Sequence, residues 1–240
     1  MHKSKLLFLN LFLLCFCLFL SSALCQNSGS DKKGTRTIYL IRHGLYNEND
    51  ERDEFVGKEL TPLGIAQARL LANRLKSMSV DFNSLVSSTM SRARQTAMVI
   101  NKEFPELVLQ QDSLIAECTP PTWRKDVMAE SDSSELAECV ENLEVSFKKY
   151  FVPSPDENDR NDLIVCHGNV IRYFVTKILN VNTMSWLQMS ITNCSLTIIR
   201  IRADGTLKLD TFGDYGHIPE NMRTFTSGEN ETKELLVPNK

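Results

Sequence analysis

Short apolar runs alternate with longer amphipathic segments through most of this 240-residue chain. Short runs rich in β-branched and aromatic side chains are typical of buried strands, whereas apolar positions three and four residues apart are typical of helices. Runs of the first kind predict strands at residues 37–41, 82–88, 107–109, 162–166, 195–201 and 206–212. Segments of the second kind predict helices at residues 62–76, 91–102, 134–151 and 169–179.

The order of these elements indicates the class of fold. Strands alternate with helices as far as residue 179, and the last two strands are joined by a turn at Ala203-Asp-Gly205, which favours an antiparallel pair. Such alternation is typical of an α/β protein whose mainly parallel sheet carries helices on both faces. The sequence therefore predicts a three-layer α/β/α sandwich, formed by a single domain at residues 37–223.

The two ends of the chain differ from this body. A short basic start, an apolar stretch at residues 6–20 and small residues at 21–23 make residues 1–25 resemble a secretory signal peptide. The apolar stretch is nearly long enough to span a thin bilayer, so an N-terminal membrane anchor is the alternative. Residues 26–36 are polar and predict a tether, and residues 224–240 predict a loose C-terminal tail.

Composition narrows the function. The chain is 42% hydrophobic and 24% charged, with a net charge of −3, which is the balance of an ordinary soluble protein. A nucleic-acid-binding protein would carry a broadly basic surface, so we expect no nucleic-acid partner. An anionic ligand would have to be held by a few local arginines.

Four cysteines lie in the body of the chain, and none of them forms a CxxC pair. That spacing argues against a zinc site. Cys166 falls in an apolar strand and Cys139 on the apolar side of a predicted helix, so we expect buried free thiols in preference to disulfides. Asn193-Cys-Ser195 and Asn230-Glu-Thr232 fit the N-glycosylation sequon, which matters only if the chain enters the secretory pathway.

Two predicted strands end in histidine followed by glycine. The first ends in Arg42-His43-Gly44 and the second in Cys166-His167-Gly168. Functional residues of α/β sheets gather at the carboxyl ends of the strands, so His43 and His167 are expected to face one crevice. Neither histidine alone would be persuasive, but two in the same context indicate function.

Arginines accompany both histidines. Arg42 directly precedes His43, Arg172 lies one turn into the helix after His167, and Arg92 begins the helix after the 82–88 strand. Guanidinium groups beside helix N-termini form a site suited to a phosphoryl dianion.

Four segments in this order resemble the histidine phosphatase superfamily, which includes the phosphoglycerate mutases. They are Arg42-His-Gly44, Leu60-Thr-Pro-Leu-Gly-Ile-Ala-Gln-Ala68, Ser91-Arg-Ala-Arg-Gln-Thr-Ala97 and Val165-Cys-His-Gly168. Within the superfamily the chain is particularly similar to the mitochondrial protein serine/threonine phosphatases of the phosphoglycerate mutase family, through segments such as Ser87-Ser-Thr-Met-Ser-Arg92 and His167-Gly-Asn-Val-Ile-Arg-Tyr173.

The resemblance implies a role for each residue of the proposed site. His43 would be the nucleophile that forms a phosphohistidine, and Arg42, Arg92 and His167 would bind the phosphoryl oxygens. His43 would have to be neutral, while His167 is expected to serve better as an imidazolium. No metal and no cofactor are needed.

The proton donor to the leaving group is the least defined of these roles. Glu117 follows an apolar segment and precedes the proline-containing loop at residues 118–125, where the family places its proton donor, with Asp112 as the alternative. Asn49 is a candidate substrate contact, and His217 receives no role.

These assignments predict a metal-independent phosphatase that acts on phosphoserine and phosphothreonine in proteins. The alternatives are a small-molecule phosphomonoesterase or phosphoglycerate mutase, and an inactive relative that binds a partner. The substrate would be a phosphorylated protein or a small phosphomonoester. Membrane attachment through the N-terminus and homo-oligomerisation stay open.

The leader and the family resemblance favour different compartments. The leader predicts the secretory pathway or an extracellular location, whereas the related phosphatases suggest a mitochondrial membrane.

Overall fold

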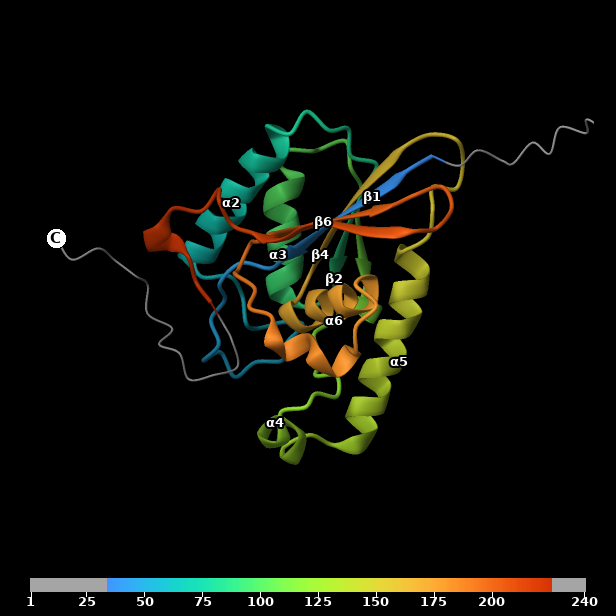
Figure 1. Cartoon of the computed structure of the whole chain (residues 1–240). Coiled ribbons are helices and arrows are strands. Elements are labelled where there is room, and N and C mark those ends of the chain that lie inside the picture. Colours follow the sequence, from blue (N-terminus) through green and yellow to red (C-terminus); the bar gives the residue numbers. More distant parts are fainter. Residues whose placement is uncertain (1–33, 226–240) are drawn as a thin grey trace, which may run out of the picture. The chain divides into compact units, whose positions relative to one another are not determined.

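A computed structural model of the chain describes residues 34–225, which form one six-stranded sheet with helices on both sides (Figure 1). The strand order is β3-β2-β4-β1-β5-β6. The strands are β1 (Arg36–Arg42), β2 (Ser84–Ser88), β3 (Leu109–Asp112), β4 (Arg160–Cys166), β5 (Leu196–Ile201) and β6 (Leu207–Asp214). Strands β1 to β4 pair in parallel, whereas β5 is antiparallel to both β1 and β6. The predicted, mainly parallel sheet is confirmed.

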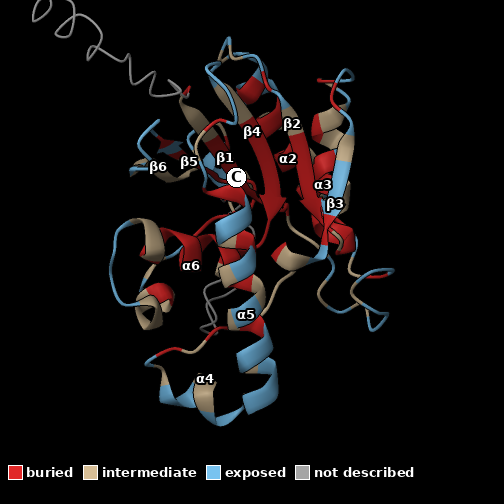
Figure 2. Cartoon of the chain, turned by 90° about the vertical axis from the view of Figure 1, so that its right-hand side faces the viewer, coloured by how far each residue is buried: buried red, intermediate tan, exposed pale blue. Residues whose placement is uncertain are grey.

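Two apolar clusters fill the spaces between the sheet and its helices. Helices α2 (Pro62–Lys76) and α3 (Ser91–Asn101) pack on one face, where Leu71 and Ile100 are fully buried. Helices α5 (Ser133–Tyr150) and α6 (Gly168–Ile178) pack on the other face, around Leu143 and Phe174. In Figure 2 the central strands are buried along most of their length. The three-layer α/β/α sandwich is therefore confirmed.

The start of α2 follows the expected capping pattern. The Thr61 hydroxyl accepts a hydrogen bond from the Gly64 amide at 3.1 Å, and Pro62 occupies the first helical position. This end of the helix packs closely against the chain that leaves β1. A Cβ atom on Gly64 would lie only 1.9 Å from the carbonyl oxygen of Leu45, so only glycine allows this approach.

Some short elements have no counterpart among the predicted ones. They are α4 (Lys125–Ala129) and three 3₁₀ segments: η1 (Ser113–Ile115), η2 (Thr183–Gln188) and η3 (Glu220–Met222). No residue of α4 is buried, so an apolar pattern could not reveal this helix. Residues 116–124 contain no helix or strand, as the prolines there predicted.

The prediction for the cysteines was half wrong. Cys166 and Cys194 are buried free thiols, but Cys118 and Cys139 form a disulfide with their Cα atoms 5.7 Å apart. Cys139 does lie on the buried side of α5, as its spacing indicated. The apolar pattern of α5 does not indicate which loop packs against the helix at Cys139, so the sequence could not identify Cys118 as the disulfide partner.

Both boundaries of the body shift outward. Backbone hydrogen bonds join Gly34 to Asp156 and Thr35 to Arg160, so the end of the predicted tether already belongs to the fold. At the other end Thr224 is buried and Phe225 pairs with Thr192, although both were assigned to a loose tail. The leader at residues 1–25 and the tail beyond residue 225 lie outside the described residues.

Within residues 34–225, no helix is both long enough and apolar enough to cross a bilayer. A membrane-anchoring segment at residues 6–20 stays a prediction for the part of the chain that is not described.

Candidate active site

The two strand-end histidines lie side by side because β1 and β4 are paired. Arg42 is level with Cys166 in the parallel register, and the His43 amide donates to the Cys166 carbonyl at 3.0 Å. The His43 and His167 ring centroids are 5.1 Å apart. The expected crevice at the carboxyl edge of the sheet is therefore present.

The surroundings of His43 select one tautomer of its ring. Its Nδ1 lies 2.8 Å from the Gly44 carbonyl oxygen, which can only accept, so Nδ1 carries the hydrogen and Nε2 keeps its lone pair. The His43 carbonyl in turn accepts from the side chain of Asn193 and the amide of Cys194. Burial lowers the pKa of His43 well below its usual value, and His167 and Arg42 lower it further. The ring is thus neutral, with the Nε2 lone pair that a nucleophile needs.

His167 is held by a serine from the neighbouring strand. Its Nε2 lies 2.8 Å from the Ser88 hydroxyl, and Ser88 also accepts the Met90 amide at 3.3 Å. Burial lowers the pKa of His167 well below its usual value, with Arg92 and Arg42 contributing. The expectation of an imidazolium is therefore wrong for this arrangement, because two cations lie beside a desolvated ring. Within residues 34–225, the buried Nδ1 of His167 has no hydrogen-bond partner.

Two arginines reach the site from different elements. Arg42, at the end of β1, is buried and donates to the Ile191 carbonyl at 2.5 Å. Arg92, in the first turn of α3, is buried, forms an ion pair with Glu54 and lies over the Tyr46 ring at 4.6 Å. Its Nε is also buried and has no hydrogen-bond partner among residues 34–225.

Glu117 approaches the histidines from the loop between η1 and α4. Its Oε1 accepts the Asn169 amide of α6 at 3.2 Å. Single ligand atoms from Glu117, His43 and His167 all lie within 4.8 Å of one another. Burial raises the pKa of Glu117, although nearby arginines oppose the shift. A carboxyl with a raised pKa keeps its proton at higher pH and can act as a general acid.

Three guanidinium groups decide which kind of ligand fits. His43, Glu117 and His167 have the spacing of a metal site, but Arg42, Arg92 and Arg172 face the same carboxyl strongly enough to affect its pKa. This concentration of positive charge repels a cation and attracts an anion.

His43, Glu117 and the three arginines line a cavity of about 260 Å³. The sequence predicted no role for six other side chains of this cavity, which are Tyr46, Thr119, Val127, Asn169, Trp186 and Leu187. Trp186 supports Arg172, whose guanidinium lies 4.7 Å from the centre of the indole ring. None of these residue types stands out in a sequence, because each acts through a contact made by the fold.

Other sequence-based candidates lie elsewhere. Asn49 is exposed and does not line the cavity. Asp112, the alternative proton donor, instead accepts hydrogen bonds from Lys149 and Tyr150. Asn193 of the first sequon is fully buried, and its side-chain amide donates a hydrogen bond to the His43 carbonyl. It is therefore not available for glycosylation in the folded chain.

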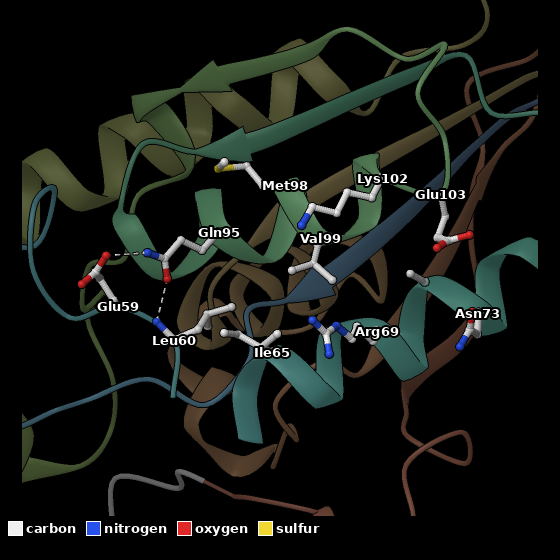
Figure 3. Close-up of a pocket in the computed structure, with 11 residues that line it drawn as sticks. Glu59, Leu60, Ile65, Arg69, Asn73, Gln95, Met98, Val99, Lys102 and Glu103 are labelled. Carbon is white, nitrogen blue, oxygen red and sulfur yellow. Dashed lines mark hydrogen bonds between the residues drawn. The ribbon is translucent and has the colours of Figure 1, made fainter. Parts of the chain in front are cut away.

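A larger hollow lies between α2 and α3 (Figure 3). It has a volume of about 590 Å³ and carries charges of both signs, including Arg69, Lys102 and Glu103. It contains none of the histidines, nor Arg42, Arg92 or Glu117. His43, Arg42, Arg92 and Glu117 instead line the smaller cavity at the sheet edge.

Comparison with known proteins agrees with this geometry. Residues 38–157 and 153–214 match the family described as the histidine phosphatase superfamily (branch 1). The serine/threonine-protein phosphatase Pgam5, mitochondrial, of Caenorhabditis elegans is 40% identical over 203 residues, which cover 80% of this chain and 67% of that protein. The human PGAM5 phosphatase is 33% identical over 201 residues, with coverage of 80% and 67%.

Solved structures share the fold. The phosphoglycerate mutase of Plasmodium falciparum has a TM-score of 0.55 and 28% identity, covering 78% of this chain and 95% of that one. The phosphoglycerate mutase of Bacillus anthracis has a TM-score of 0.60 at 19% identity, covering 78% and 96%.

We expect Ser88→Ala to lower kcat/KM by about tenfold, because one hydrogen bond worth about 1.4 kcal/mol no longer orients His167. Ser87→Ala is a matched control, since Ser87 is equally buried but its hydroxyl has no partner among the described residues. Steady-state kinetics on p-nitrophenyl phosphate, with thermal unfolding as a check on folding, measure both. Equal losses in the two variants would contradict the role of Ser88.

Proposed function

This chain belongs to the histidine phosphatase superfamily and is a phosphoric monoester hydrolase, and we propose that it removes phosphate from phosphoserine and phosphothreonine in proteins through a phosphohistidine on His43. The observation that carries the proposal is the grouping of His43, His167 and Glu117 within 4.8 Å, amid buried arginines. The choice of a protein substrate draws on the relatives, whose names describe serine/threonine-protein phosphatases.

The first step transfers the phosphoryl group to His43. The lone pair on Nε2 attacks phosphorus, because Nδ1 is committed to the Gly44 carbonyl. Arg42 and Arg92 would stabilise the charge on the equatorial oxygens, together with the Nδ1 hydrogen that His167 carries when its Nε2 accepts from the Ser88 hydroxyl. Glu117 gives its proton to the departing serine or threonine oxygen, which is a poor leaving group without it.

The second step hydrolyses the phosphohistidine. Glu117, now a carboxylate, removes a proton from water as the water oxygen attacks phosphorus, and this regenerates neutral His43 and protonated Glu117. Each group thus returns to the protonation state that its surroundings favour. No metal or cofactor takes part in this scheme.

Replacing His43 tests the nucleophile. We expect His43→Ala to lower turnover of p-nitrophenyl phosphate by about a thousandfold or more, because the covalent route is lost, while the fold is preserved. Mass spectrometry of alkali-quenched wild-type enzyme should find phosphate on the peptide that contains His43. An active His43→Ala variant would remove His43 from this role.

The same enzyme preparation separates a phosphatase from a mutase. Incubation with 3-phosphoglycerate and 2,3-bisphosphoglycerate should release inorganic phosphate or leave both substrates unchanged. Interconversion of phosphoglycerates without phosphate release would contradict the proposed reaction. An inactive partner-binding relative would fail to hydrolyse p-nitrophenyl phosphate at all.

Replacing Glu117 tests the proton donor. We expect Glu117→Gln to lower kcat on a phosphoserine peptide by about a hundredfold or more, and on p-nitrophenyl phosphate by less than about tenfold, because nitrophenolate leaves without protonation. Glu130→Gln is a control, since Glu130 is exposed outside the catalytic cavity. Equal losses of Glu117→Gln on both substrates would argue for a structural role.

The pH profile follows from the directions of the two shifts. The lowered pKa of His43 keeps the nucleophile neutral into the acidic range, so wild-type activity declines only at low pH. The raised pKa of Glu117 preserves its proton at higher pH, and activity on the peptide declines as the pH rises through that pKa. The Glu117→Gln variant should lose this alkaline decline.

We infer further that residues 1–25 direct the chain into the secretory pathway, with a mitochondrial membrane as the alternative. The related phosphatases are mitochondrial by name. The leader pattern and the disulfide both favour an oxidising compartment. We expect mass spectrometry of the mature protein to find an N-terminus at Leu24 or Gln26. An N-terminus that retains residues 6–20 would support an anchor instead.

A further inference from the structure

The segment that carries Glu117 is anchored on both sides by contacts with distant elements. Before it, Ile115 is fully buried and Asp112 accepts a hydrogen bond from Tyr150 of α5 at 2.5 Å. After it, the carbonyl groups of Pro120 and Pro121 both accept from the indole nitrogen of Trp186. Between these anchors, residues 116–119 contain no helix or strand.

Two connections hold the middle of this segment. Asn169 at the start of α6 donates its backbone amide to Glu117 and its side-chain amide to the Cys118 carbonyl at 2.9 Å. The second connection is covalent, because Cys118 is bonded to Cys139 of α5. Cys118, the residue directly after Glu117, is therefore covalently fixed to α5, the helix that follows the loop.

The disulfide supplies a constraint that packing does not. Of residues 119–138, which it closes into a loop, only Pro120 and Thr122 are buried. Cys139 is the first buried residue of α5, and the residues before it are exposed except for the half-buried Leu136, along the part of the helix nearest α4 in Figure 2. Without the cross-link, few apolar contacts would keep this loop against the helix.

The disulfide can also be reached from solvent. Cys118 and Cys139 line a cavity of about 680 Å³, which also contains Glu117 and Thr119. Glu117 and Thr119 in addition line the catalytic cavity, so the disulfide and the catalytic centre share a wall. Cys118 is only half-buried.

We propose that the Cys118–Cys139 disulfide positions Glu117 for proton donation to the leaving group, and that reduction of this disulfide by a dithiol weakens proton donation. A thiolate of the dithiol attacks one sulfur and releases the other cysteine, and its second thiolate then displaces the first cysteine. The dithiol is oxidised to its disulfide by two electrons, and Cys118 and Cys139 end as two thiols. The reduced loop no longer holds Glu117 beside the phosphoryl group. This inference rests on the proposed function of Glu117.

The experiment compares oxidised and dithiothreitol-reduced full-length enzyme on two substrates. Reduction should lower kcat/KM for a phosphoserine peptide by about tenfold or more, and that for p-nitrophenyl phosphate by less than about threefold, because only the first needs the acid. Reoxidation should restore the activity. A Cys118→Ser/Cys139→Ser variant should behave like the reduced enzyme and no longer respond to dithiothreitol, which controls for the other cysteines.

A further variant separates positioning of Glu117 from loosening of the fold. In Glu117→Gln, reduction should change the activity on either substrate by less than about twofold, because the group being positioned is absent. Equal losses on both substrates, or an unchanged phosphoserine activity after complete reduction, would overturn the inference. If the oxidised wild-type enzyme hydrolysed neither substrate, or hydrolysed them no faster than His43→Ala does, the proposed function itself would be overturned. The two failures are therefore distinguishable.

Discussion

The parallel pairing of β1 with β4 is the constraint on which the candidate site depends. Arg42 lies level with Cys166, so the chain leaves both strands at the same height and His43 and His167 become neighbours. A register shift of one residue would turn the side chains of the shifted strand to the opposite face and exchange the residues that fill the two apolar clusters. The core that fixes the register thereby fixes the distance between the histidines, so stability and chemistry depend on the same pairing.

The electrostatics of the site follow from this burial. Arg42 and Arg92 are almost fully enclosed beside two imidazoles, and Glu54 is the carboxylate that pairs with Arg92. Burial disfavours the charged imidazolium and lowers the pKa of each histidine, and the positive charge fixed nearby lowers it further. A bound phosphoryl dianion would offset the cost of enclosing the guanidinium groups, which supports the proposed function.

How much could be predicted from the sequence depends on how local each signal is. The strand-end histidines and the cap at Thr61 are marked by their immediate neighbours, and the structure places them as expected. Asn169, Tyr46 and Ser88 act through contacts between distant segments, for which a single sequence carries no pattern. The disulfide was missed for the same reason, since the apolar stripe of α5 explains the burial of Cys139 without identifying its partner.

The same distinction divides the candidate site into two parts. The candidate phosphate-binding residues sit on strand ends and helix starts within the core, where packing leaves little freedom. Glu117 sits on a loop whose position is set by Asn169, Trp186 and a disulfide to an otherwise exposed part of α5. Every phosphomonoester presents the same phosphoryl group, whereas the proposed proton transfer from Glu117 would bring the loop beside whatever is attached to the phosphate. Changes in substrate selectivity and in regulation can therefore arise in the Glu117 loop without disturbing the paired strands that hold His43 and His167.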